Sequence, residues 1–403
     1  MVRKTWRQQK LLCFMASSIG DMIAMYPLVK ISADILKSTL CKVLKTLSDI
    51  GFDVVTNITD GHSANRKLYK CLGGGTLMPS IEHPANFEDT LFPLFDPVHL
   101  FKNFYTNLLR KESFKCPKVD KKSVDVCLSQ VISLYHRELG KSVKIAHKLS
   151  HKVLYPLPIE RSKVELADRF FHESTINGLE FYGEIDRPEW LASARFLRII
   201  RKWWDICNVR SACVGVRKRD KDKEPISNEK CQQIRFLNTF AAWLKEWSIM
   251  PASSKSALSK ETFECAIQTS EALPKLCENL LTEKKIDYVL LGKITSDPIE
   301  RRFGRYRQLH GRNYYLSVRE FLEAEKKIRL KALVKFSKLS LGDIKEIYTE
   351  VQENKKSAIR SDGEMLLACL DSDLEQIKAD VGDEAIIFCL WLYCLQRNEK
   401  KQL

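Results

Sequence analysis

The chain has 403 residues, more than one ordinary domain contains, so two or three folding units are expected. Hydrophobic residues make up 44% of it, which excludes wholesale disorder, and no run of about 18 apolar residues predicts a membrane-spanning helix. The 66 Lys and Arg exceed the 51 Asp and Glu, which favours a polyanionic partner, and we expect nucleic acid rather than a membrane.

The first 60 residues predict two strands, a helix and a third strand, over 11–19, 22–30, 32–48 and 52–59. Gly20-Asp21 suits a tight hairpin turn between the first two strands. Gly51 is expected to end the helix, and the third strand stops at Asp60. A helix between strands implies a parallel crossover onto the existing sheet.

Residues 62–95 contain several prolines and the run Gly73-Gly74-Gly75, and they are expected to form loops. No Lys-Ser/Thr follows the glycines, so a flexible turn is predicted rather than a phosphate-binding loop. Helices are predicted over 96–109, 122–139, 161–181, 189–209, 228–247, 260–282, 297–306 and 317–338. A short strand or turn is predicted at 288–292, and a helical tail from 341 is expected to end in the apolar run 386–395.

Thirteen cysteines are scattered through the chain without a C-x-x-C pair. Disulfide frameworks are typical of short secreted chains, so these thiols are expected to be reduced, in a cytosolic or nuclear protein. A structural zinc ion is not expected, because no His lies at zinc-site spacing from Cys389 and Cys394.

Two acids lie where a two-metal mechanism of phosphodiester chemistry could use them. That mechanism needs carboxylates that hold two divalent ions about 4 Å apart. Asp60 ends a predicted strand and Glu300 lies one turn into a predicted helix. Each has an ordinary alternative, because Asp before Gly is common in turns and an acid in a first helical turn compensates the helix dipole.

Three segments resemble the motifs of P-element-like transposases, in the family's order: TDGHSANR at 59–66, DPVHLFKN at 96–103, and SDPIERRFGRYR at 296–307 with GRN at 311–313. The resemblance implies an α/β RNase H-like core that is interrupted by a large, mainly α-helical GTP-binding insertion. It implies Asp60 as the second acid and Glu300 as the third acid of a D-D-E triad. Such a triad uses Mg²⁺ or Mn²⁺ to cleave and transfer DNA strands.

The same resemblance implies four parts of the chain. The N-terminal part of the RNase H-like domain covers 1–90, the insertion 91–285, the C-terminal part of the RNase H-like domain 286–335, and a helical C-terminal region 336–403. The protein is expected in the nucleus, bound to transposon ends and target DNA mainly through phosphate groups. A homo-oligomer stays open as an alternative to a single copy.

The segment Trp203–Asn208 resembles the family's aromatic-Asp-x-x-Asn nucleotide motif. The resemblance implies Trp204, Asp205 and Asn208 as guanine contacts, since a carboxylate can accept from the base's N–H groups and an aromatic ring can stack on the base. The alternative is that both tryptophans belong to a helix core. Asp297 is implied to link the nucleotide to the active site, and Lys152 is a candidate phosphate-binding lysine.

Four arginines lie around Glu300 on one predicted helix: Arg301, Arg302, Arg305 and Arg307. Their position favours contacts with DNA phosphates, which fix the position of DNA without reading its sequence. The alternative is a solvated helix face, because runs of charge usually form one.

The chain departs from the family before its first hairpin. The family's first catalytic Asp lies on a strand upstream of that hairpin, yet none of residues 1–10 is acidic. Asp21 belongs to the hairpin turn, and no THAP zinc module precedes it. We therefore interpret the chain as an N-terminally truncated transposase, lacking the first strand and leaving the hairpin with an unpaired edge. We expect no DNA cleavage by the chain alone.

Two other functions stay open. The chain could be a non-catalytic, transposase-derived protein that binds nucleic acid or guanine nucleotide. It could also be a helical scaffold in which the motifs merely persist. Affinity for guanine nucleotide separates the binding protein from the scaffold.

Overall fold

The computed structural model describes residues 10–16, 21–28, 31–117, 123–250, 257–313, 315–337 and 387–395. The chain forms two compact units. The first comprises 1–54, 84–86 and 296–403, and the second comprises 55–83 and 87–295. The four-part division expected from the sequence stays a prediction.

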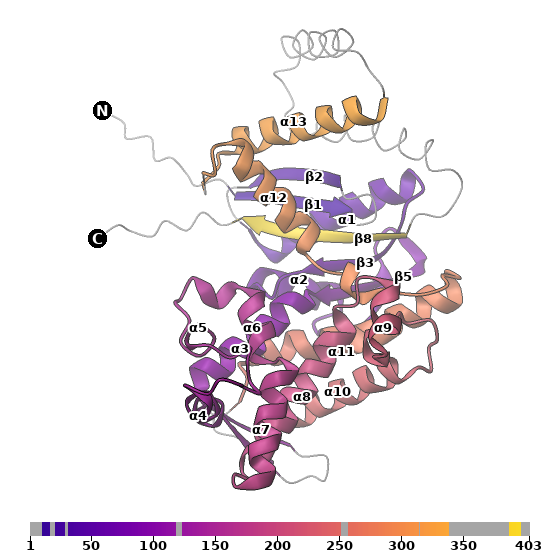
Figure 1. Ribbon diagram of the computed structural model, residues 1–403. Helices are drawn as coiled ribbons and strands as arrows, with labels where there is room; N and C mark the ends of the chain where they lie inside the picture. Colours follow the sequence, from indigo (N-terminus) through magenta and orange to yellow (C-terminus); the bar gives the residue numbers. More distant parts are fainter. Residues whose placement is uncertain are drawn as a thin grey trace, which may run out of the picture. The chain divides into compact units, whose positions relative to one another are not determined.

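The first unit contains a sheet in which β1 (Lys10–Ala16) lies between β2 and β8 (Figure 1). β2 (Asp21–Leu28) pairs with β1 antiparallel, from Lys10↔Leu28 to Ala16↔Asp21, as the predicted hairpin requires. β8 (Ile387–Leu395) pairs antiparallel with the other edge of β1, from Leu11↔Leu395 to Ala16↔Leu390. The hairpin prediction is confirmed, and its turn at 17–20 lies outside the described residues.

The strand β8 corrects two expectations. The run 386–395 was expected to be helical, but Ile387–Leu395 is a strand. A short, uniformly apolar run has no period that separates helix from strand, and here a long-range pairing decides. The hairpin was also expected to have an unpaired edge, whereas β1 has a partner on each side.

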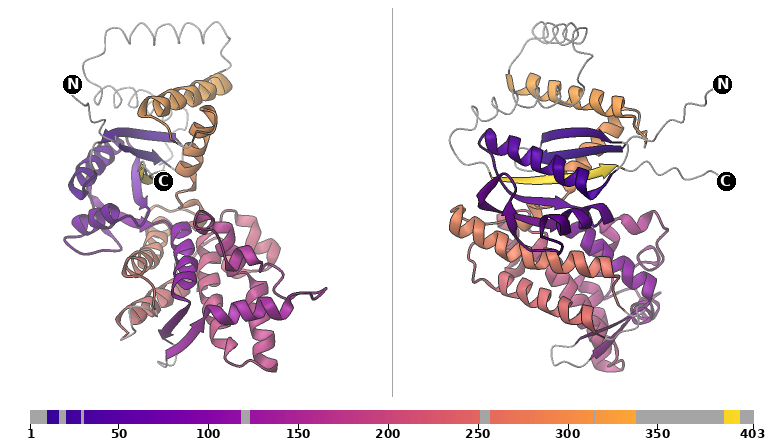
Figure 2. Two further views of the ribbon diagram at one scale, coloured as in Figure 1. Left: turned by 90° about the vertical axis from the view of Figure 1, so that its left-hand side faces the viewer. Right: turned by 180° about the vertical axis from the view of Figure 1, so that it is seen from behind.

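α1 lies on one face of this sheet and α12 (Asp297–Leu309) lies on the other, while α13 (Val318–Ser337) lies beside β2 (Figure 2). α1 (Ala33–Asp49) begins at Ser32, whose side chain accepts a hydrogen bond from the Ile35 backbone N–H. Gly51 follows the helix with φ 85°, a left-handed conformation that favours glycine. The predicted helix is confirmed, and its buried side is the apolar stripe from Leu36 to Leu47.

The second unit holds most of β3 (Asp53–Thr59) and β5 (Asn86–Phe95), which pair in parallel from Thr56↔Phe92 to Thr59↔Phe95. The short strand β4 (Ile81–His83) lies beside β5. Residues 62–95 were expected to be loops, but they contain β4, β5 and α2 (Ser63–Leu72). One of the prolines in this segment, Pro93, lies within β5 opposite Asn57, and the Gln268 side chain donates to the Pro93 carbonyl.

The remainder of the second unit is mostly helical, as predicted, and packs on a β-hairpin. Its helices are α3 (Pro97–Lys111), α4 (Leu128–Glu138), α5 (His151–Leu154), α6 (Val164–Phe170), α7 (Glu173–Ile185), α8 (Trp190–Cys207), α9 (Ala212–Lys218), α10 (Gln232–Ile249) and α11 (Lys260–Glu278). Its 3-10 and π turns are Glu160–Ser162, Lys221–Lys223, Asn279–Glu283 and Leu291–Lys293. The antiparallel hairpin β6 (Ser113–Pro117) and β7 (Ser123–Cys127) replaces the start of the helix expected over 122–139.

Aromatic side chains fill the core of the second unit. Trp203 and Trp247 are among its largest fully buried residues. The ring of Phe104 meets Trp203 edge-on, and Phe240 stacks on Trp203. Within the described part of the chain, no helix is both long and apolar enough to cross a membrane.

Candidate catalytic and binding residues

Two aspartates follow two neighbouring strands of the second unit. Asp60 comes directly after β3 and Asp96 directly after β5. The strands are parallel, with Thr59 opposite Phe95, so both acids lie at the same edge of the sheet. The Asp96 N–H donates to the Thr59 carbonyl at 2.9 Å, which ties the two strand ends together.

The carboxylate of Asp60 is half-buried and held by its own turn. Its Oδ1 accepts from the His62 backbone N–H at 3.0 Å and from the Asn65 side-chain amide at 2.8 Å. The first bond is a local side-chain-to-backbone turn of the kind Asp favours. Asp60 thus lies at the end of a rigid strand, as the sequence predicted, with one oxygen fixed.

The turn after Asp60 is braced from α2 and α11. Arg66 donates to the Gly61 carbonyl at 2.6 Å, and its Nε lies 3.7 Å from Glu264. Lys70 pairs with the same carboxylate at 2.9 Å. Burial raises the pKa of the neighbouring Cys265 thiol to about 12, so this cysteine is neutral at physiological pH and no nucleophile.

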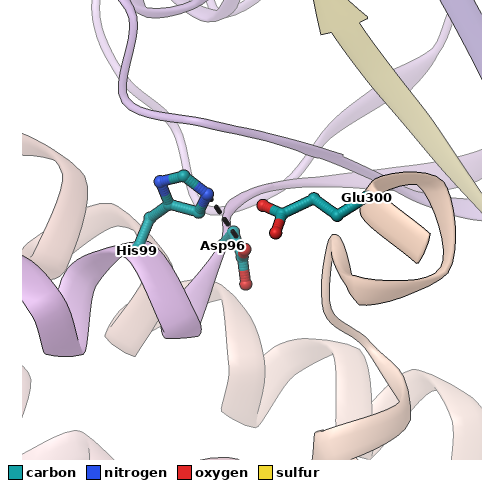
Figure 3. Close-up of side chains that lie close together, drawn as sticks. All are labelled: Asp96, His99 and Glu300. Atoms are coloured by element: carbon teal, nitrogen blue, oxygen red, sulfur yellow. Dashed lines mark ion pairs between the residues drawn. The ribbon is translucent and has the colours of Figure 1, made fainter. Parts of the chain in front are cut away.

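Asp96 and His99 form a pair within the DPVHLFKN segment, and the sequence did not single out either residue (Figure 3). Asp96 is fully buried and begins α3, because its side chain accepts from the Val98 N–H at 3.0 Å. The His99 Nε2 lies 3.8 Å from the Asp96 carboxylate. An Asp directly before Pro97 at a helix start was the available signal for this cap.

In the first unit, Glu300 lies in the first turn of α12 (Asp297–Leu309) and is half-buried (Figure 3). The Ser296 hydroxyl donates to its carboxylate at 3.3 Å. Asp297 is half-buried at the first residue of the same helix, one turn before Glu300. The predicted helix and the placement of both acids within it are confirmed, while their chemical roles stay predictions.

Arg302 differs from the expectation of a DNA contact. Its side chain is buried and donates to Glu325 of α13 (Val318–Ser337) at 2.7 Å and to Asp21 at 2.6 Å. The Tyr306 hydroxyl donates to Glu325 as well, and the Arg329 Nε lies 3.0 Å from the Glu325 carboxylate. These contacts hold α12 and α13 to β2, so Arg302 stabilises the fold rather than facing a phosphate. Asp21 is occupied by the same cluster.

Electrostatics within this cluster favour charged side chains. Burial opposes ionisation of Glu325, but the hydrogen bonds from Arg302 and Tyr306 outweigh it and hold the pKa of that carboxyl below its ordinary value. Burial also opposes the charge on Arg302, yet the bond to Glu325 raises the pKa of the guanidinium. The cluster is a compensated buried ion pair.

The other arginines of α12 do reach the surface. Arg301 and Arg305 are exposed and lie four residues apart, on one face of the helix. Arg307 is half-buried in the last turn. The two exposed side chains are available to a phosphate backbone, and their contact with DNA stays a prediction.

The proposed nucleotide residues lie in and after α8, where the structure favours the helix-core alternative for the tryptophan. Trp204 is 4% exposed, and its ring stacks on Phe101 with centroids 4.2 Å apart and planes 3° apart. Buried in this way, Trp204 does not offer a face to a guanine base. Asp205 pairs with Arg201 at 2.7 Å and with Lys223 at 3.1 Å, so cations already hold its carboxylate.

The side chains of Asn208 and Lys152 also have partners within the protein. Asn208 caps the C-terminus of α8, and its side-chain oxygen accepts from Arg210 at 2.9 Å. Lys152 pairs with Glu160 at 2.6 Å, and this hydrogen bond lowers the pKa of the Glu160 carboxyl. Both side chains are partly exposed, so the structure leaves them within reach of a ligand.

Comparison with known proteins yields three matches. A family model of the TNP-like RNase H N-terminal domain matches residues 3–73. The transposable element P transposase of Drosophila melanogaster is 23% identical over 282 residues, which are 68% of this chain and 35% of the relative. The solved Drosophila P element transposase strand transfer complex matches with a TM-score of 0.66 and 19% identity, over 76% of this chain and 66% of that chain.

The matches define a mixed α/β protein related to transposases. More particularly, the chain is similar to P element transposases, as the resemblance of its motifs predicted. It spans about a third of the length of the curated relative that it matches.

Proposed function

We propose that the chain contributes to metal-dependent cleavage and transfer of DNA strands, the reaction of P-element-like transposases. The observation that carries the proposal is Asp60, a half-buried carboxylate at the end of β3 within a segment that resembles the family's second acid. Its carboxylate oxygens suit Mg²⁺ or Mn²⁺, which prefer hard oxygen ligands. The solved relative is a strand transfer complex, which supports DNA as the substrate and therefore a nuclear location.

Glu300 is the proposed second ligand, on the strength of its motif and its place in the first turn of α12. The bound ions would activate the attacking oxygen and stabilise the leaving oxygen. The chain's own residues contribute by holding carboxylates on rigid elements, so that little reorganisation is needed when an ion binds.

Binding of Mn²⁺ to the full chain, followed by electron paramagnetic resonance, tests this proposal. Asp60→Asn and Glu300→Gln should each weaken binding by about tenfold or more, because each removes a charged ligand. The exposed Asp34 in the first turn of α1 supplies the control Asp34→Asn, which should bind as the parent does. Parent-like binding by both Asp60→Asn and Glu300→Gln would exclude the assignment.

A non-catalytic, transposase-derived nucleic-acid-binding or guanine-nucleotide-binding protein is the second candidate. The exposed pair Arg301 and Arg305 favours nucleic acid. For the nucleotide, the motif around Asp205 is the support, but a guanine would have to displace Arg201 or Lys223 from that carboxylate. Stacking on Trp204 does not fit its burial. Comparing GTP with ATP binding tests the guanine assignment.

A further inference from the structure

Asn65 is a buried polar residue that the proposed chemistry does not yet use. It is 3% exposed and lies in the first turn of α2. Its side-chain amide donates to the Asp60 Oδ1 at 2.8 Å and approaches the Asp60 carbonyl at 3.5 Å. Because a carboxylate only accepts hydrogen bonds, the amide nitrogen must be the group that faces Asp60.

The two oxygens of Asp60 are therefore not equivalent. Oδ1 accepts two hydrogen bonds, one from Asn65 and one from the His62 backbone N–H. In the described part of the chain, no hydrogen bond or ion pair engages Oδ2. A carboxylate fixed through one oxygen presents the other in a set orientation, which suits monodentate coordination of a hard cation.

We propose that Asn65 is a positioning residue that orients Asp60 so that its second oxygen binds the divalent ion. The inference rests on the proposed role of Asp60 as a metal ligand. Asn65 is suited to this task because its own place is fixed by burial and by α2, while Arg66 anchors the same turn at the Gly61 carbonyl. Groups that orient a metal ligand typically change metal affinity about 10–100-fold when removed.

A second buried amide in the same unit supplies a matched control. Asn107 of α3 is 7% exposed and donates to the Asn103 carbonyl at 2.8 Å and to the Thr262 hydroxyl at 3.2 Å. It also accepts from the Ser259 N–H at 3.0 Å. Asn107→Ala thus removes a buried, hydrogen-bonded amide that does not touch Asp60.

The test is Mn²⁺ binding to the full chain by electron paramagnetic resonance, with thermal unfolding measured in parallel. Asn65→Ala should weaken Mn²⁺ binding about tenfold or more. Asn107→Ala should keep the parent's affinity within about twofold, although both variants lower the unfolding temperature. Asp60→Asn serves as the reference for loss of the ligand itself.

Each outcome is decisive. Mn²⁺ binding that is weaker in Asn65→Ala but unchanged in Asn107→Ala supports the positioning role. Parent-like binding in Asn65→Ala with loss in Asp60→Asn overturns it and leaves the proposed function standing. Equal losses in Asn65→Ala and Asn107→Ala overturn it too, because the effect is then only structural. Parent-like binding in Asp60→Asn removes the metal role of Asp60 itself.

Discussion

The role of a single residue in this protein depends on whether its side chain is buried or exposed. Arg301 and Arg302 are neighbours in the sequence. Arg301 is exposed, whereas Arg302 is buried, with only 8% exposure, and donates to Glu325 and Asp21. A helix turns about 100° per residue, so of two adjacent side chains one can face solvent while the other packs in the core. The run of arginines therefore splits into a surface pair and a structural residue.

Arg302→Met should destabilise the fold by about 3–5 kcal/mol, because it leaves Glu325 buried without its main partner. Arg301→Met is the control and should stay within about 0.5 kcal/mol of the parent, since that side chain is exposed. Urea unfolding measures both. Equal stability of the two variants would contradict the assigned role of the cluster.

The same cluster predicts a pH dependence. The pKa of Glu325 is lower in the folded protein, so its contribution to stability is fully present above the unfolded-state pKa of about 4.3. That contribution is lost as the pH falls through the lower folded-state value. The stability difference between the parent and Glu325→Gln should therefore shrink below about pH 4, as urea unfolding at several pH values would show. A constant difference across this range would argue against an ionised Glu325.

At the scale of elements, the pairing of β1 with β8 is the feature that the sequence did not predict. It brings together segments separated by most of the chain, with Cys13 opposite Tyr393. Such a non-local ladder is invisible to local periodicity. The strand β5 shows the same limit, because it contains Pro93 and its parallel pairing with β3 is also non-local.

The register can be tested with a disulfide. Tyr393→Cys places a thiol opposite the natural Cys13, so mild oxidation should link residues 13 and 393. Leu392→Cys is the matched control: it is opposite Phe14, one position away, and should not link to Cys13. Peptide mapping by mass spectrometry reads out both. A helix at 387–395 would give no preference for position 393.

For the whole molecule, the net charge of +15 suits a phosphate backbone as partner. Specific reading of bases requires side chains in a groove, whereas phosphate contacts are independent of sequence. We therefore expect DNA binding by this chain to be weak and to depend steeply on salt.

Replacing both Arg301 and Arg305 by Ala should flatten the slope of log K against log salt by up to about 2, because each lost phosphate contact contributes about 0.9 on duplex DNA. The exposed pair Arg217 and Lys218 in the last turn of α9 provides a control with the same change in charge. Fluorescence anisotropy at several salt concentrations gives the slopes. Equal flattening in both double variants would show a general charge effect rather than a surface on α12.

The sequence by itself determined the elements that depend on neighbours along the chain. The hairpin, α1 with Gly51 after it, α8 and α12 all follow from periodicity and end signals, and the motif around Asp60 identified the P-element-like relationship. Tertiary structure decided the rest: the strand β8, the burial of Arg302 and Trp204, and the cations on Asp205. These depend on partners distant in the sequence, because an apolar run, an arginine or an aspartate takes its role from what packs against it.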